Sequence, residues 1–163
     1  MIKPDIQTHL KILQDGLKRK KAALTEILSI TENQKTVIES ELPLDSVREM
    51  IFGMNEAKQK AIQIVKDCDD MFEKMLKEVG PELEAQQEMF KPQVKILQDS
   101  IRAVMDLDVK IRVTEDENNK LLDARRGVEL PQAQTGLKPK VTMPTDTAKV
   151  LNAYKQGKTN YKG

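Results

Sequence analysis

The chain has 163 residues, of which 33% are charged and only 3% are aromatic, and its formal net charge is +1. A β-sandwich draws on aromatic and β-branched residues, so this composition disfavours an all-β fold and favours long helices with charged outer faces. The balanced charge gives no general electrostatic attraction to nucleic acid. The length fits one domain followed by a tail.

The first predicted helix begins near Pro4 or Asp5, because proline is tolerated in a first helical turn. Its apolar residues recur with a repeat close to seven, which predicts a coiled-coil-like bundle surface. Polar residues interrupt the same seam, so we do not expect a fully dry core. The apolar positions are Ile6, Leu10, Leu13, Leu17, Leu24, Ile27, Leu28 and Ile38, and the polar ones are Lys20, Thr31 and Gln34.

The segment Glu41–Asp45 interrupts this pattern, because Pro43 has no N–H and restricts the residue before it. Asp45 or Ser46 is the expected N-cap of the second helix, which then runs to about Val79. Apolar residues line one side of this helix. They are Val47, Met50, Ile51, Met54, Ala61, Ile64, Val65, Cys68, Phe72, Met75, Leu76 and Val79.

The pair Gly80-Pro81 either breaks the helical pattern or opens a third helix. Pro92 lies inside the apolar run that follows, and we expect it to kink the third helix or to mark its start. This helix ends near Arg126. Its seam becomes polar in the second half, so the last turns are expected to extend beyond the bundle. The polar seam positions are Asp108, Glu115 and Asn118.

Gly127 ends the helical pattern, and the residues after it have the proline- and polar-rich composition of a linker. We predict a bundle domain over residues 1–127, a flexible linker over 128–145, and a short C-terminal helix and tail over 146–163. A helix this short is marginal by itself and needs a surface to dock on. Its apolar face would carry Val150, Leu151 and Tyr154.

The predicted fold class is therefore all-α. We expect an elongated antiparallel bundle of three long helices with a flexible C-terminal tail that carries a short helix. From Val128 onward the chain carries six lysines against two acidic residues, so this part is basic and the rest is mildly acidic. Such an arrangement is common among soluble proteins and is only a weak binding signal.

No residue pattern predicts catalysis, so we expect a protein that is not an enzyme and that uses no cofactor or metal. His9 is the only histidine and has no nucleophile or carboxylate partner on its predicted face. Cys68 is the only cysteine, which excludes an internal disulfide. A structural zinc site needs four convergent ligands. Cys68 falls on the apolar stripe, whereas Asp67 and Asp70 lie three residues apart on a flank that we expect to be solvated.

Two further charged segments, Lys18–Lys21 and Glu115–Glu117, are expected to lie mainly on solvated helix faces. No aromatic residue is interleaved with the basic segment, so we predict no nucleic-acid partner. The first ten residues lack the apolar core of a signal peptide, and no stretch approaches the roughly 18 apolar residues of a membrane span. The expected location is the cytoplasm.

Six methionines lie on or near the apolar stripes of the predicted helices, namely Met50, Met54, Met71, Met75, Met89 and Met105. One interpretation is that they fill the core. The other is that they form an adaptable surface for a client protein, because flexible thioether side chains repack easily. Both interpretations stay open, and each can hold for different methionines.

The block Met50–Phe72 resembles a helix of the FliT/FlgN-type flagellar export chaperones. Lys58–Ile62 is similar to their K/R-Q-x-x-I segment, and Cys68–Phe72 is similar to their L/C-D-x-x-F segment. Ile27–Lys35 resembles a stretch of their first helix, and Ala153–Lys155 resembles a short terminal motif. The third helix resembles the pattern of Gram-positive members through Ile101, Met105, Leu107, Asp108, Ile111, Glu117, Asn118 and Leu121.

This resemblance, which extends from about Leu10 to Tyr154, implies a non-catalytic cytoplasmic chaperone. Such a protein binds a hook-associated or filament-cap protein, prevents its premature assembly and escorts it to the flagellar type III export apparatus. The resemblance also implies that the C-terminal helix either contributes to client binding or covers the groove until the client arrives. The residues predicted to bind the client are Met50, Met54, Met71, Met75, Val150, Leu151 and Tyr154.

A second class of function stays open, namely a non-catalytic coiled-coil scaffold or stalk subunit of a larger assembly. The oligomeric state separates the two classes. A chaperone is expected to be a monomer or a weak dimer, whereas a scaffold is expected to form a tight, elongated oligomer.

Overall fold

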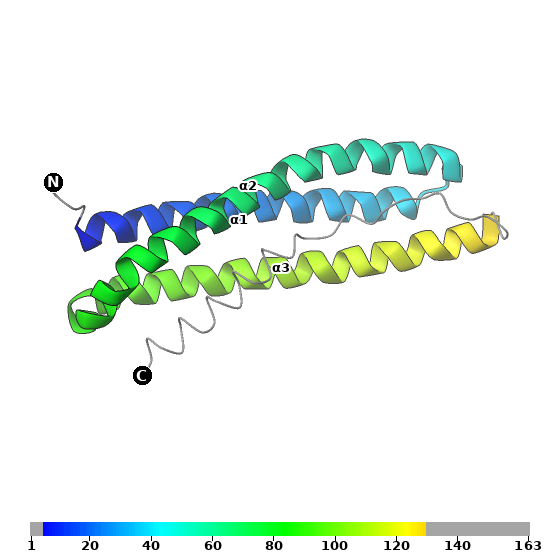
Figure 1. Cartoon of the computed structure of the whole chain (residues 1–163). Helices are drawn as coiled ribbons and strands as arrows, with labels where there is room; N and C mark the ends of the chain where they lie inside the picture. Colours follow the sequence, from blue (N-terminus) through cyan, green and yellow to red (C-terminus); the bar gives the residue numbers. More distant parts are fainter. Residues whose placement is uncertain (1–4, 130–163) are drawn as a thin grey trace.

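The computed structural model describes residues 5–129 and shows three long helices. These are α1 (Ile6–Ile38), α2 (Leu44–Ala85) and α3 (Gln87–Glu129). Each helix runs antiparallel to the next one in the chain, so α1 and α3 point in the same direction in an elongated bundle (Figure 1). The described residues contain no strand. The predicted all-α bundle of three long helices is confirmed. The predicted linker and short C-terminal helix lie outside the described residues.

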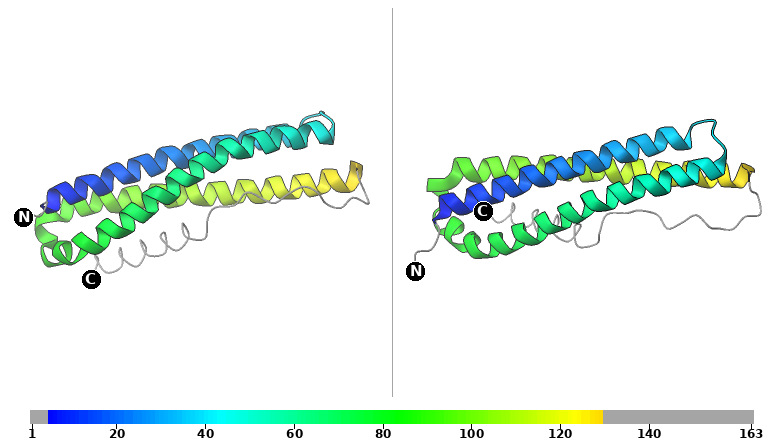
Figure 2. Two further views of the ribbon diagram at one scale, coloured as in Figure 1. Left: turned by 45° about the horizontal axis from the view of Figure 1, so that its top comes forward. Right: turned by 90° about the horizontal axis from the view of Figure 1, so that it is seen from above.

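Helix α1 is the central element of the bundle. It packs along both α2 and α3, whereas α2 and α3 contact each other at few positions. The views in Figure 2 show α2 and α3 joined at one end of the bundle, with α1 alongside both of them. The stability of the bundle therefore depends mainly on the two faces of α1.

The start of α1 follows the prediction. Asp5 is the N-cap residue, and its carboxylate accepts a hydrogen bond of 2.8 Å from the backbone N–H of Thr8. This hydrogen bond lowers the pKa of the Asp5 carboxyl group. The side of α1 that faces the other helices carries the predicted apolar and polar seam. Its buried members are Ile6, Leu10, Leu13, Leu17, Lys20, Ala23, Leu24, Ile27, Thr31, Gln34 and Ile38.

The start of α2 differs from the prediction. The N-cap residue is Pro43 in an extended conformation, and no side chain caps the helix. Asp45 lies in the first turn instead, because Leu44 is buried and already belongs to the helix. Arg125 of α3 contacts the turn between α1 and α2. Its guanidinium group donates hydrogen bonds to the carbonyl oxygens of Ile38 at 3.0 Å and Leu42 at 2.7 Å.

The pair Gly80-Pro81 does not break α2, which continues to Ala85. Proline removes one hydrogen bond of the helix. However, Val79 and Leu83 on either side of it are 1% exposed and hold this turn against the core. Packing thus outweighs the local preference for a break.

The predicted kink near Pro92 is confirmed. α3 has non-helical backbone angles at Phe90, where φ is −109° and ψ is 15°. Pro92 has no N–H to continue the ladder of hydrogen bonds, so the chain bends just before it. At its other end α3 passes through Gly127 and reaches Glu129.

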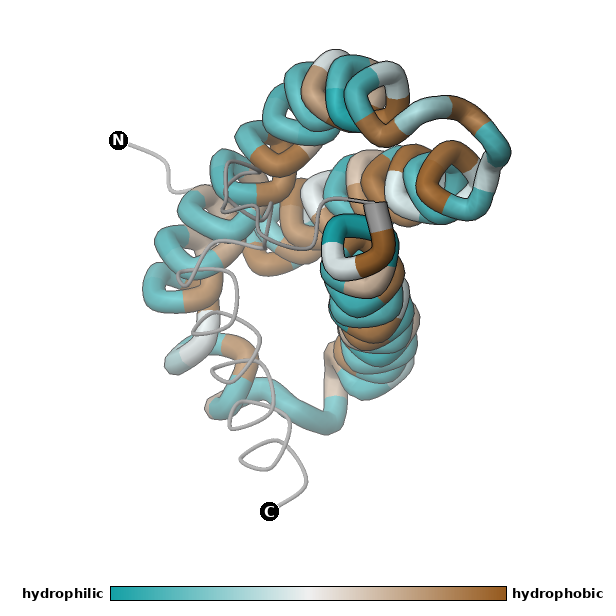
Figure 3. Tube along the Cα trace, turned by 90° about the vertical axis from the view of Figure 1, so that its right-hand side faces the viewer, coloured by the Kyte–Doolittle hydropathy of each residue, from teal (hydrophilic) through white to brown (hydrophobic). Residues whose placement is uncertain are grey.

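The interior divides into two halves of different chemistry. We call the half near the α2–α3 connection the apolar half and the half near the α1–α2 turn the polar half. Figure 3 looks along the bundle and shows hydrophobic positions interleaved with hydrophilic ones on all three helices. The buried residues of the apolar half include Leu10, Leu13, Leu17, Phe72, Val79, Leu83, Phe90, Leu97 and Val104.

In the polar half, buried polar side chains come from all three helices. Asp108, Glu115 and Asn118 of α3 are 5%, 8% and 5% exposed, so the polar part of the seam lies inside the bundle. The end of α3 reaches past the α1–α2 turn (Figure 1). Glu115 and Asn118 meet polar partners on α2 and α1, whereas Asp108 is bonded by Arg112 of α3 itself. The other buried polar residues of this half are Thr31, Gln34 and Lys58.

Candidate protein-binding surface

One flank of α2 carries apolar residues at alternating steps of four and three. This spacing, close to 3.5 residues, keeps side chains along one line of a helix and is the repeat that a coiled-coil partner recognises. The line is about 38 Å long at 1.5 Å per residue. We call it the α2 seam, and its members are Met50, Met54, Ala57, Ala61, Ile64, Cys68, Met71 and Met75.

The α2 seam has an inner row and an outer row. In the inner row Ala61 and Cys68 are buried and Met54 and Met75 are half-buried, so this row borders the core. The outer row consists of Met50, Ala57, Ile64 and Met71, and it is the more exposed of the two, although Ile64 still packs against the core. Met50 is 45% exposed and Met71 is 50% exposed, while Ala57 is exposed and Ile64 is half-buried.

Helix α1 borders the inner row. Burial raises the pKa of the Cys68 thiol, and the positive charge of Arg19 on α1 opposes this shift. Arg19 therefore lies close enough to the inner row to act on it electrostatically. Gly16 lies one turn before Arg19 on α1, and a Cβ atom placed there would meet no atom within 4 Å.

Charged residues flank the outer row on its solvent side. Lys60, Asp67 and Lys74 each follow a member of the outer row by three residues, and all three are exposed. Asp67 accepts a hydrogen bond of 2.9 Å from the amide of Gln63. An apolar line beside charges of both signs has the composition of a protein interface with a polar rim.

The structure places the four predicted methionines together on the α2 seam. Met54 and Met75 are half-buried beside the core, as the core-filling interpretation expects, whereas Met50 and Met71 are exposed. Sequence reasoning did not select Ala57 or Ile64 as site residues, although their three- and four-residue spacing from the methionines was available as a signal. The other predicted site residues, Val150, Leu151 and Tyr154, lie outside the described residues.

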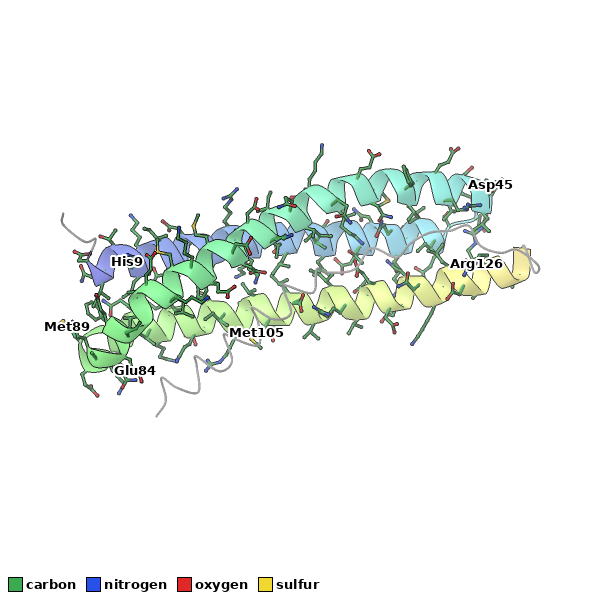
Figure 4. All side chains as sticks on the ribbon, in the orientation of Figure 1. His9, Asp45, Glu84, Met89, Met105 and Arg126 are labelled. Atoms are coloured by element: carbon green, nitrogen blue, oxygen red, sulfur yellow. The ribbon has the colours of Figure 1, made fainter. Side chains whose placement is uncertain are left out.

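Two other methionines lie on different parts of the molecule. Figure 4 shows Met89 at the end where α2 and α3 join, with His9 and Glu84 labelled at the same end, and Met105 midway along α3. Met89 is 69% exposed, whereas Met105 packs against the core. Neither belongs to the α2 seam.

The aspartates around Cys68 behave differently from one another. Asp67 and Asp70 are exposed, as predicted for a solvated flank, but Asp69 is buried and forms an ion pair with Lys20 of α1. The burial of Asp69 was not predicted, because its partner Lys20 comes from another helix. Glu115 departs from the prediction of a solvated face.

The largest buried polar cluster links all three helices. The Nζ atom of Lys58 lies 3.1 Å from Oε1 of Glu115 and 2.7 Å from Oε1 of Gln34. The amide of Gln34 donates to Oδ1 of Asn55 at 2.7 Å. Burial lowers the pKa of Lys58 and raises the pKa of Glu115, and each group opposes the shift of the other.

This cluster is a structural layer of the bundle. Lys58 and Glu115 are 2% and 8% exposed, so a substrate does not reach them in this conformation. Residues 5–129 contain no group of three or more His, Cys, Asp or Glu side chains that could hold a metal ion. A shallow surface depression on α2 is lined entirely by charged residues. They are Asp70, Glu73, Lys74, Lys77 and Glu78.

Comparison of the chain with protein-family models, curated proteins and solved structures found no match. The resemblance to flagellar export chaperones therefore stays a prediction from the sequence. No helix within the described part of the chain is long and apolar enough to cross a membrane.

Proposed function

We propose that this protein is a non-catalytic protein-binding bundle that holds an amphipathic helix of its partner along the α2 seam. The observation that supports this most is the exposed outer row, in which Met50 and Met71 present about half of their surface to solvent. A partner helix with apolar residues at the same spacing would cover this row.

The energetics favour such an interaction. Fully burying a methionine side chain contributes about 1.5–3 kcal/mol, so covering the exposed half of Met50 or Met71 contributes about 1 kcal/mol each. Methionine side chains also adapt to differently shaped partners, because they are unbranched and polarisable. Ala57 at the centre of the outer row lets a partner backbone or a bulky side chain approach closely.

The chaperone interpretation names the partner. In this proposal the protein is a cytoplasmic chaperone that binds a hook-associated or filament-cap protein, prevents premature assembly and escorts it to the flagellar export apparatus. It is a monomer or weak dimer until the client binds. The support is the sequence resemblance, together with an exposed apolar line that suits a helical client.

The second candidate is a scaffold or stalk subunit. It is favoured by a different observation, the exposed pair Val109 and Val113 on α3, which are 58% and 52% exposed and lie one turn apart. In a scaffold these residues would contact a second copy in a constitutive oligomer. The two candidates thus use different helices and respond to different substitutions.

The first experiment mixes the purified protein with purified hook-associated and filament-cap proteins and measures the mass of the complex by size exclusion with light scattering. The chaperone proposal predicts a stoichiometric complex with one of them. Absence of any complex at tens of micromolar overturns that proposal. A concentration-independent oligomer that Val109→Glu with Val113→Glu dissociates supports the scaffold instead.

A substitution on the α2 seam tests the surface itself. Met50→Glu with Met71→Glu should weaken binding at least about tenfold, because each charge would be buried against an apolar helix. Phe52→Glu is the matched control, since Phe52 is 71% exposed on a different face of α2. Equal losses in the two variants would contradict the assignment of the surface.

A further inference from the structure

Helix α3 changes character at Asp108. Its buried residues before this point are all apolar, namely Phe90, Leu97 and Val104. We call residues 108–129 the α3 arm. Only one of the four buried residues in the arm is apolar, and the four are Asp108, Ile111, Glu115 and Asn118.

The interior contacts of the α3 arm are mainly polar. Glu115 pairs with Lys58 at 3.1 Å, and the amide of Asn118 donates to the carbonyl oxygen of Thr31 at 2.9 Å. A buried ion pair gives little net stability, because the loss of hydration offsets most of the attraction between the charges. These contacts orient the arm more than they stabilise it.

Asp108 weakens the attachment of the arm further. Its Oδ2 atom accepts a hydrogen bond of 2.8 Å from Arg112, which belongs to the arm itself, so this contact survives if the arm moves. Its Oδ1 atom is buried without a hydrogen-bond partner. An unsatisfied buried acceptor disfavours the closed arrangement and gains hydration when the arm opens.

Arg125 of the arm donates hydrogen bonds to the carbonyl oxygens of Ile38 and Leu42 at the α1–α2 turn, and opening breaks these bonds. Along their length, however, α1 and α2 pack directly against each other. Both helices carry buried apolar residues in this half of the bundle, and Ile27 of α1 and Ile62 of α2 belong to the same core cluster. α2 and α3 contact each other at few positions, so the departure of the arm breaks few contacts with α2. The α1–α2 pair therefore remains a packed unit without the arm.

From this division we infer that the α3 arm opens away from α1 and α2 as one unit, while the α1–α2 pair and the first half of α3 stay folded. The hinge lies between Val104, which is fully buried, and Asp108. Opening separates Ile111 from the core and uncovers apolar surface of α1 around Ile27. Opening of the α3 arm does not involve the α2 seam. The inference therefore does not depend on whether the proposed partner helix binds there.

Native-state hydrogen exchange of the full chain, followed by mass spectrometry or NMR, tests this inference. Amides of residues 108–122 should show protection at least about tenfold lower than amides of 94–104. Residues 24–38 and 47–62, which lie beside the arm, should keep the higher protection. Equal protection in both parts of α3 overturns the inference. Equally low protection in all three helices at this end of the bundle also overturns the inference, because it indicates ordinary fraying of the bundle end.

A variant tests the physical cause. Asp108→Leu, Glu115→Leu and Asn118→Leu combined with Lys58→Met replace the polar contacts of the arm by apolar ones. Protection in residues 108–122 should rise at least about tenfold, toward that of residues 94–104. The matched control is Lys20→Met with Asp69→Leu, which removes a buried ion pair between α1 and α2 and should leave the arm unchanged. If protection of residues 108–122 does not rise in the first variant, or rises equally in both variants, the polar contacts of the arm are not the cause of its opening.

Discussion

The inward-facing residues of the apolar half and of the polar half have the same helical spacing, but they are of different types. In the apolar half, Leu13 and Leu97 face their neighbours with aliphatic side chains, whereas in the polar half Lys58 and Glu115 occupy equivalent inward positions. The comparison shows that helical periodicity decides which residues face inward. The residue types then decide how strongly that position holds the helices together.

The largest expected effect is the loss of packing in the apolar half. Leu13→Ala should lower the free energy of unfolding by about 2–5 kcal/mol, because Leu13 is 1% exposed and its removal leaves a cavity. Urea unfolding followed by circular dichroism measures this change. Lys11→Ala, at an exposed position of the same helix, serves as control and should change stability by less than about 0.5 kcal/mol.

The next largest change in the free energy of unfolding is expected in the polar half, and it has the opposite sign. Lys58→Met combined with Glu115→Leu should leave the protein equally stable or raise the free energy of unfolding by up to about 4 kcal/mol. The reason is that both charges lose hydration on burial. A loss of several kcal/mol in the same unfolding experiment would show that the ion pair stabilises the polar half as strongly as leucine stabilises the apolar half.

A smaller effect is expected for the hydrogen bond between α3 and α1. Asn118→Ala should lower the free energy of unfolding by about 0.5–1.5 kcal/mol, because it removes the donor to the Thr31 carbonyl oxygen. The adjacent Asn119→Ala is the control, since Asn119 is only half-buried. If Asn118→Ala costs as much as Leu13→Ala, the distinction between the halves does not hold.

The smallest expected effect is a dependence of the free energy of unfolding on pH. Burial raises the pKa of Glu115 above its usual value of 4.5, so the folded state holds this proton more tightly than the unfolded state. The resulting contribution to stability is fully present below about pH 4.5 and is lost as the pH rises through the folded-state pKa. Relative to Glu115→Gln, the wild-type protein should therefore lose stability as the pH rises toward neutrality.

Unfolding both proteins in urea at several pH values between 4 and 7 measures this difference. The lowered pKa of Lys58 does not change the direction of this trend between about pH 4 and 7. The stability that is linked to deprotonation of Lys58 is gained only at higher pH. A difference that instead grows in favour of the wild-type protein with rising pH would show that the attraction of Lys58 outweighs burial. Glu56→Gln, at an exposed position of α2, controls for general charge effects.

Much of the fold was predictable because long amphipathic helices have a strong local signal. The start of α1 at Asp5, the interruption around Pro43 and the kink near Pro92 follow from backbone preferences of individual residues. The continuation of α2 through Pro81 was not predictable in this way. It depends on Val79 and Leu83, which pack against residues far away in the chain.

The candidate surface was partly predictable for a similar reason. The methionine positions indicated a stripe on α2, but the sequence did not separate exposed Met50 and Met71 from half-buried Met54 and Met75. That distinction depends on where α1 lies beside α2. The polar seam in the second half of α3 likewise suggested helical turns in solvent. The partners of Glu115 and Asn118 come from other helices, so the sequence did not reveal them.

The amino-acid sequence alone determined the class of the fold, because helix propensity, capping and a 3–4 apolar repeat act between residues that are close in the chain. The tertiary structure decided the interior placement of Asp69, Asp108 and Glu115, because a charged side chain is buried only where a partner from another element or from its own turn meets it. It also decided which row of the α2 seam faces solvent, because α1 covers one side of that line and leaves the other exposed.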